Sequence, residues 1–112
     1  MAQNRLMFEA NYIDGSWVGA DNKAVMNVTD KATGDIIGTI PVSGAVETRR
    51  AIDAAHHAFM QYSQMTAQER AALLHKLADI IRVEADELAT LLTLEQGKPL
   101  AEAKGEVLMG AN

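Results

Sequence analysis

The first third of the chain alternates short apolar runs with turn-forming residues, a pattern typical of β-hairpins. Asn11–Ile13 is a β-prone run, Asp14-Gly15-Ser16 forms a turn, and Trp17-Val18 resumes the strand. An Asp-Gly pair between two such runs favours a tight hairpin, because the turn needs positive φ and Gly adopts it freely. The sequence therefore predicts a first hairpin over residues 11–18.

A second hairpin is predicted directly after the first. Val25–Thr29 alternates apolar and polar side chains, which is the period of a half-buried strand. Asp30–Gly34 is interpreted as a turn and Ile36–Val42 as the return strand. Pro41 has no N–H to donate, so we expect it at an edge or an end of that strand.

From Gly44 onward the apolar positions recur at three- and four-residue spacing, which predicts helices. The first helix is expected from about Ala45 to Gln61, and Gly44 with Glu47 three residues later marks its start. Its apolar side chains share one face, which carries Ile52, Ala55, Phe59 and Tyr62. The chain thus changes from strand to helix near Ser43.

A better-marked helix start follows at Thr66, which can form a capping box with Glu69. The helix beyond it carries one unbroken apolar row, made of Leu74, Ala78, Ile81, Ala85, Leu88 and Leu92. A second row runs beside it through Leu73, Leu77 and Ile80 and then meets Glu84 and Glu87. We therefore expect a kink or a break within residues 82–86 and a helix end at Gly97.

The last helix is predicted to start at Lys98-Pro99, since Pro suits a first helical turn, and to be still running at Asn112. A helix without a C-terminal cap indicates that the natural chain is longer. The predicted fold class is α+β, with two hairpins followed by three to four helices in one partial domain over residues 1–112. Within it we expect a flexible lead (1–10), the hairpins (11–43) and the helices (44–112).

Composition and charge narrow the classes of function. Apolar residues make up 48% of this 12.1-kDa chain, and the surface scaling law predicts burial of about two-thirds of the unfolded surface around a small aliphatic core. The net charge of −5 disfavours nucleic acid as a partner, because phosphate binding needs a clustered cationic face. The lack of Cys excludes disulfides, zinc fingers and thiol nucleophiles. With no apolar run long enough for a membrane span or a signal peptide, we expect a cytoplasmic protein without a membrane partner.

Side chains that often carry chemistry form no recognisable site in the sequence. His56 and His57 are adjacent, so on a helix they point about 100° apart and cannot bind one ion together. Glu102 and Glu106 lie four residues apart, a spacing that can hold a cation but is more typical of an exposed helix face. No strand–glycine–helix unit is expected, because the paired glycines fall in the hairpins: Gly15, Gly19, Gly34 and Gly38. We predict no catalytic residue, no cofactor-binding residue and no metal ligand in this chain.

Four segments together resemble the N-terminal region of the NAD(P)-dependent aldehyde dehydrogenase superfamily. They are Tyr12–Val18, Thr29–Gly38, Thr66–Ala78 and Leu94–Ala103. Their order and spacing agree with the family pattern over about residues 11–110, with Lys31 in place of the family's Pro. Within the family, Thr93–Glu106 is typical of the succinate-semialdehyde dehydrogenase branch, and close relatives that act on other small semialdehydes share it.

The resemblance implies that the chain is the entry to the family's cofactor-binding domain, which is α/β and Rossmann-like. Family members are several times longer, and their pattern places the nucleophilic Cys, the general-base Glu, the oxyanion-stabilising Asn and the nucleotide contacts after the matching region. NAD or NADP is therefore implied for the full-length family, whereas we expect no cofactor on this chain. Some members hold a monovalent cation near the positions that match Val28-Thr29 and Glu106.

The resemblance also suggests partners. The remainder of the dehydrogenase chain would cover the apolar helix rows, which are wider than a small helical cluster can bury. Without it, we expect an exposed apolar patch and self-association through the helix faces, and the full-length enzyme is expected to be a homo-oligomer. The alternative is a free-standing helical interaction module without enzymatic activity.

The isolated chain is expected not to oxidise aldehydes, because it lacks the Cys whose thiolate would attack the aldehyde carbon. In a mixture with succinate semialdehyde and either nicotinamide cofactor, the absorbance of the reduced cofactor should stay at the level of a buffer control. Turnover by protein free of host dehydrogenases would contradict this prediction.

Overall fold

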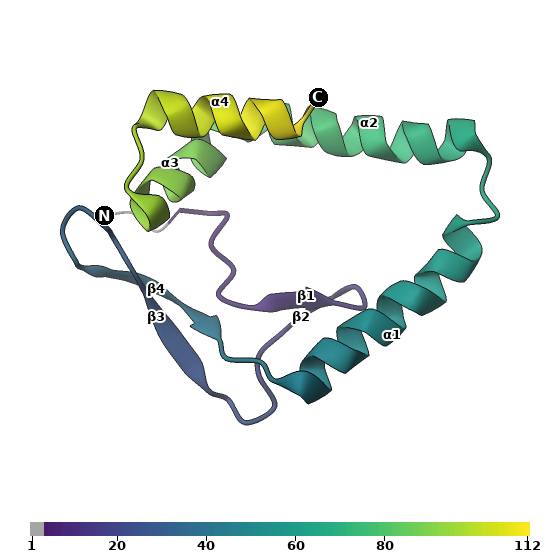
Figure 1. Ribbon diagram of the computed structural model, residues 1–112, viewed down its shortest axis with the longest axis horizontal. Coiled ribbons are helices and arrows are strands. Elements are labelled where there is room, and N and C mark those ends of the chain that lie inside the picture. Colours follow the sequence, from purple (N-terminus) through teal and green to yellow (C-terminus); the bar gives the residue numbers. More distant parts are fainter. Residues whose placement is uncertain (1–3) are drawn as a thin grey trace.

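The computed structural model describes residues 4–112 and shows two antiparallel hairpins followed by four helices (Figure 1). The strands are β1 (Asn11–Ile13), β2 (Ser16–Val18), β3 (Val25–Thr29) and β4 (Ile36–Pro41). The helices are α1 (Ala45–Tyr62), α2 (Ala67–Val83), α3 (Ala85–Gln96) and α4 (Leu100–Gly110). This order confirms the predicted α+β fold class. The elements follow one another round an open ring with principal extents of 48 × 36 × 19 Å (Figure 1).

The turn chemistry predicted for the first hairpin is present. Asp14 and Gly15 both have positive φ, 50° and 77°, as a two-residue hairpin turn requires. Tyr12 lies opposite Trp17 in the β1–β2 ladder. The second hairpin has a register irregularity between Val28 and Thr29, and β4 ends at Pro41, as its missing N–H predicts.

The turn between β3 and β4 is attached to the end of α3. Asp30 is buried, and its Oδ1 accepts the N–H of Ala32 at 2.7 Å. The N–H of Lys31 donates to the carbonyl oxygen of Leu94 at 3.1 Å. At this contact Gly97 has a φ of 78°, and a Cβ there would lie 3.1 Å from Cβ of Lys31. Glycine at position 97 therefore ends α3 and also leaves space for the turn.

The predicted break after the second apolar row is confirmed. Glu84 has φ −92° and ψ 6° and separates α2 from α3, within the predicted residues 82–86. The last helix differs from the prediction: Pro99 is its N-cap rather than its first turn, with ψ 140°. The expectation that the helix is still running at Asn112 is also wrong, because α4 ends at Gly110. Arg82 Nη2 donates to the carbonyl oxygen of Ala111 at 2.7 Å and so joins the C-terminal ends of α2 and α4.

The aliphatic core expected from the composition is not formed. The buried apolar residues of the described chain are all alanines, namely Ala20, Ala85, Ala89, Ala103 and Ala111. The accessible surface is 8268 Å², against roughly 6,000 Å² for a compact protein of this mass. The radius of gyration of 16.6 Å likewise exceeds the roughly 13 Å of a compact domain of this length. Among the described residues the fully buried apolar side chains are small, and the large ones are half-buried or exposed.

Replacement of Thr66 by Ala is expected to destabilise the chain by about 1 kcal/mol, the usual cost of a lost helix cap. Thr66 Oγ1 accepts the N–H of Glu69 at 3.2 Å, and Glu69 Oε2 accepts the N–H of Thr66 at 2.8 Å, so the predicted capping box is formed. Denaturant unfolding of Thr66→Ala and of the parent gives the difference.

Thr90→Ala is the matched control, since Thr90 Oγ1 donates to the Asp86 carbonyl inside a helix and caps nothing. Such a bond competes weakly with the helix ladder, and Ala has the higher helix propensity. Superimposable curves for Thr66→Ala and the parent would show that the cap does not stabilise α2.

Candidate functional site: an apolar face of α1 and α2

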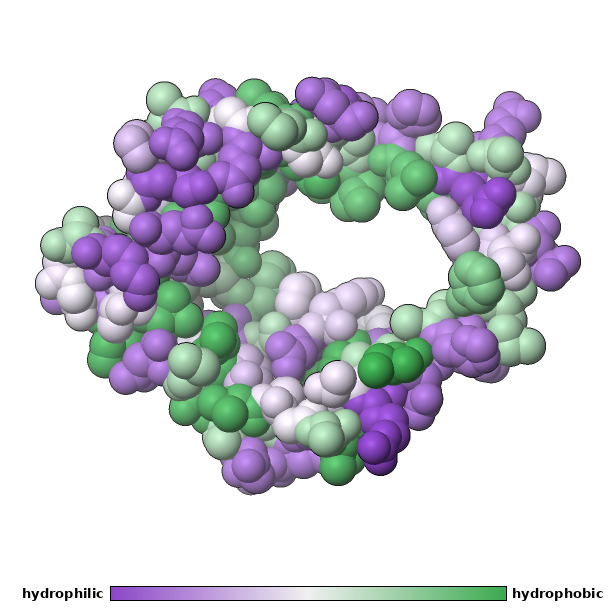
Figure 2. Space-filling model, viewed as in Figure 1, coloured by the Kyte–Doolittle hydropathy of each residue, from purple (hydrophilic) through white to green (hydrophobic). Residues whose placement is uncertain are grey.

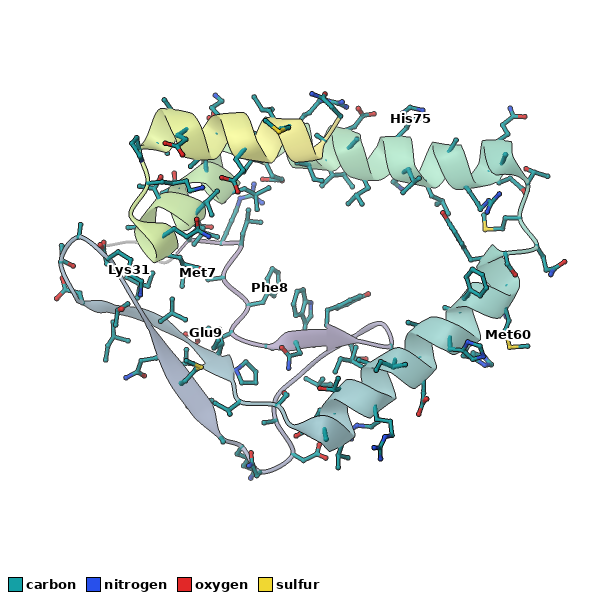
Figure 3. The ribbon with its side chains drawn as sticks, in the orientation of Figure 1. Met7, Phe8, Glu9, Lys31, Met60 and His75 are labelled. Atoms are coloured by element: carbon teal, nitrogen blue, oxygen red, sulfur yellow. The ribbon has the colours of Figure 1, made fainter. Side chains whose placement is uncertain are left out.

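The His and Glu side chains that were candidates for chemistry in the sequence do not come together in one site. His56 and His57 are exposed on α1, and His75 points away from the opening of the ring on α2 (Figure 3). Glu106 is held in an ion pair with Lys98, not in a carboxylate pair. Within residues 4–112, no three His, Asp or Glu side chains come together in a group that could hold a metal ion.

One strand–glycine–helix unit does occur, contrary to expectation, where β4 leads through Gly44 into α1. Its helix N-terminus already holds an anion, the buried carboxylate of Glu47. Glu47 Oε1 accepts the N–H of Asp21 at 2.9 Å, and Oε2 accepts the N–H of Gly44 at 3.1 Å. These bonds, with that of Asp21 foremost, hold the pKa of Glu47 below its ordinary value. The residues present therefore do not fit a nucleotide phosphate at this position.

The two apolar rows of the second helical region have different surroundings. The row that begins at Leu74 is half-buried or buried from Ala78 through Ala85, where α2 contacts α3 and α4, but Leu74 itself is 59% exposed. The other row, Leu73, Leu77 and Ile80, is 50–54% exposed. Local packing therefore covers one row only from Ala78 onward and leaves the other row exposed.

The uncovered row is part of a set of exposed large side chains on α1 and α2, which together we call the apolar face. It consists of the exposed side chains Ile52 and Phe59 of α1 and Leu73, Leu74, Leu77 and Ile80 of α2. Figure 2 shows hydrophobic atoms bordering the opening of the ring beneath α2. The described helices include none long and apolar enough to cross a membrane.

Aromatic side chains from the first hairpin and the segment before it form a second exposed apolar cluster. Phe8 and Trp17 are stacked, with ring centroids 4.2 Å apart and an interplanar angle of 3°. Tyr12 is tilted against Trp17 with its centroid 5.1 Å away. Phe8 points toward the opening of the ring (Figure 3), and all three rings are more than half exposed.

This arrangement is suited to covering another surface rather than to catalysis. The accessible area exceeds that of a compact protein by about 2,200 Å², the order of an obligate interface. Exposed apolar patches beyond a few hundred Å² usually mark interaction sites. The width of the helix rows in the sequence predicts this site. The roles of Glu47 as an anchor and of Phe8 in the aromatic cluster have no sequence signal, because both depend on contacts between distant elements.

Comparison with known proteins identifies the family. Residues 17–112 match the aldehyde dehydrogenase family. The chain belongs to this family. It is 49% identical over 108 residues to a glutarate-semialdehyde dehydrogenase of Pseudomonas aeruginosa, covering 96% of this chain and 22% of that protein. It is 48% identical over 100 residues to a succinate-semialdehyde dehydrogenase [NADP(+)] of Escherichia coli, covering 89% of this chain and 21% of that protein.

The fold agrees with solved structures of the same family. The crystal structure of a succinate-semialdehyde dehydrogenase from Burkholderia pseudomallei matches with a TM-score of 0.93 and 48% identity. That match covers 99% of this chain and 23% of the other. The chain thus spans about a fifth of the length of these relatives and corresponds to the start of their fold.

The isolated chain is expected not to bind NAD or NADP measurably, because among residues 4–112 the helix N-terminus that follows β4 already has the Glu47 carboxylate bonded to the Gly44 N–H. Calorimetric titration with each dinucleotide is the measurement, and the Escherichia coli relative named for NADP(+) serves as the positive control. Saturable binding tighter than roughly 100 μM, or about −5.5 kcal/mol, would overturn this expectation.

The uncovered apolar face is expected to make the isolated chain either self-associate, most often as a two-fold dimer, or loosen and bind hydrophobic dyes. Sedimentation over a hundredfold range of concentration, with dye fluorescence on the same samples, separates these outcomes. A monodisperse, dye-silent monomer that melts cooperatively would contradict both.

Proposed function

We propose that this chain is the opening part of an enzyme that oxidises a small semialdehyde to the carboxylic acid with NAD or NADP. The supporting observation is 48–49% identity over most of the chain to relatives named for glutarate semialdehyde and succinate semialdehyde. Both compounds carry a carboxylate at the end opposite the aldehyde, so the proposed substrate class is a short aldehyde with an anionic tail.

Within such an enzyme the proposed role of these residues is structural. The chain contains no Cys, so the nucleophile of the family's reaction has to come from another part of the enzyme. The apolar face and the aromatic cluster supply a surface on which the remainder of the cofactor-binding domain would pack. A cytoplasmic location belongs to the same proposal, and the Cys-free composition suits a reducing compartment.

The alternative, a free-standing helical interaction module, has less support. The relatives that this chain matches by sequence are named as dehydrogenases. A free-standing module would also have to leave its apolar face exposed to water. The DNA that follows the codon for Asn112 distinguishes the two. A frame that continues with a Trp-Asn-Phe-Pro-like segment and a later Gly-Gln-x-Cys-like segment supports the dehydrogenase.

A chimera tests the proposal directly. We expect the Pseudomonas aeruginosa relative, with its matching segment replaced by this chain, to reduce NAD or NADP in the presence of glutarate or succinate semialdehyde. Leu77→Lys in the chimera should lower this activity at least tenfold, because a charge would be placed in the covered apolar face.

Lys76→Ala on the same helix is the matched control and should keep the activity of the unchanged chimera. An inactive chimera beside an active parent enzyme would count against the proposed function. Full activity of Leu77→Lys would show that the apolar face is not where the remainder of the enzyme packs.

A further inference from the structure

Residues 4–9, which we call the strap, cross from the helical side of the ring to the hairpins (Figure 1). The flexible lead predicted from the sequence spans residues 1–10, of which residues 1–3 lie outside the described residues, and each end of the strap makes specific contacts. At the helical end, Asn4 Nδ2 donates to the backbone oxygen of Glu87 at 3.2 Å. Arg5 Nε donates to Glu87 Oε1 at 2.8 Å, and Arg5 Nη2 pairs with Glu84.

The Arg5 contacts lie at the junction of α2 and α3. Glu84 is the residue that separates the two helices, and Glu87 lies in the first turn of α3. One guanidinium therefore bridges a carboxylate at the break and a carboxylate inside the next helix. These two partners raise the pKa of Arg5, with Glu87 as the larger influence.

At the other end, the strap is joined to both hairpins. Phe8 stacks on Trp17 of β2. Glu9 has a φ of 47°, in the left-handed region that non-glycine residues rarely adopt, and its Oε1 accepts the N–H of Thr39 in β4 at 2.7 Å. The side chains of Met7 and Glu9 lie over Gly38, where an added Cβ would come within 2.8 Å and 2.9 Å of them (Figure 3).

Few other contacts in residues 4–112 join the hairpins to the helical side of the ring. The bond from the Lys31 N–H to the Leu94 oxygen is a second link between the β3–β4 turn and α3. On the opposite side, the ring is continued by residues 63–66 between α1 and α2. Without the strap, only the contact of the β3–β4 turn with α3 would hold the ring closed on this side. The ring could then open by bending at residues 63–66.

We propose that residues 4–9 act as a conformational strap, which holds the hairpins to the α2–α3 junction and keeps the ring closed. A single exposed ion pair contributes little, so the strap depends on its two ends acting together. The idea that the remainder of the enzyme packs on the closed ring rests on the proposed function. The strap is inferred from contacts within this chain and does not rest on the proposed function.

Spin-label distance measurements in the 112-residue chain test the strap. The chain has no Cys, so Asn27→Cys on β3 and Lys76→Cys on α2 introduce two unique labelling sites. Dilution with unlabelled chain restricts the signal to distances within one molecule. If the chain self-associates and so keeps its fold, we expect a narrow distance distribution for the parent and one at least twice as broad when Arg5→Ala and Phe8→Ala are combined.

Arg49→Ala is the matched control, because Arg49 is a surface arginine of α1 for which residues 4–112 show no ion pair, and it should leave the distribution narrow. Helical circular dichroism shows whether each variant keeps its helices. If the double variant loses them, two other measurements decide. Gly38→Ala displaces the side chains of Met7 and Glu9 without substituting any residue of the strap, and 1 M salt screens the Arg5 pairs in the parent. Both should broaden the distribution.

A parent distribution that is already broad overturns the strap. So do folded strap variants that stay as narrow as the parent, or a narrow distribution in both Gly38→Ala and high salt. These outcomes are distinct from failure of the proposed function, because the label distances require no dehydrogenase activity and the chimera assay requires no distance measurement.

Discussion

The structure depends on how its large apolar side chains are covered, because the chain itself leaves many of them exposed to solvent. Burial of apolar surface is the main force that stabilises a folded chain. Within residues 4–112 the buried apolar residues are alanines, while six large side chains of the apolar face are at least half exposed. Apolar packing within these residues therefore contributes little to the stability of the fold. A second surface that binds only the closed ring would stabilise it by mass action, so folding and docking of this segment are coupled.

With so little packing, polar contacts at the corners of the ring define its shape. Glu47 joins the start of α1 to the loop at Asp21, and Arg82 joins α2 to the end of α4. The backbone N–H donors that surround Glu47 lower its pKa. A lowered carboxyl pKa contributes stability that is fully present above the ordinary pKa and is lost as the pH falls through the lowered one. This corner therefore keeps its full contribution at neutral pH and weakens only in acid.

Features that depend on neighbouring residues could be predicted from the sequence, and contacts between distant segments could not. The hairpin at Asp14-Gly15 and the break at Glu84 follow from turn chemistry and from where an apolar row ends. The stack of Phe8 on Trp17 and the pairing of Arg5 with Glu84 leave no local pattern, since the partners are 9 and 79 residues apart. The aliphatic core was wrongly expected because composition and the surface scaling law assume a compact chain that covers its own apolar side chains, and this chain does not cover them.

Lys31, which stands in place of the proline of the family pattern, makes one of the contacts between distant segments. Proline at this position would fix φ but would have no N–H, whereas the N–H of Lys31 donates to the Leu94 oxygen at 3.1 Å. Carbonyl groups in the last turn of a helix lack partners within the helix, so this bond satisfies a group that α3 leaves free. Gly97 permits the approach, because a Cβ there would lie 3.1 Å from that of Lys31. A proline stabilises chiefly by restricting the unfolded chain, so lysine replaces that local restriction with a bond between two elements. In a ring with few such links, that bond supports the closure to which the strap also contributes.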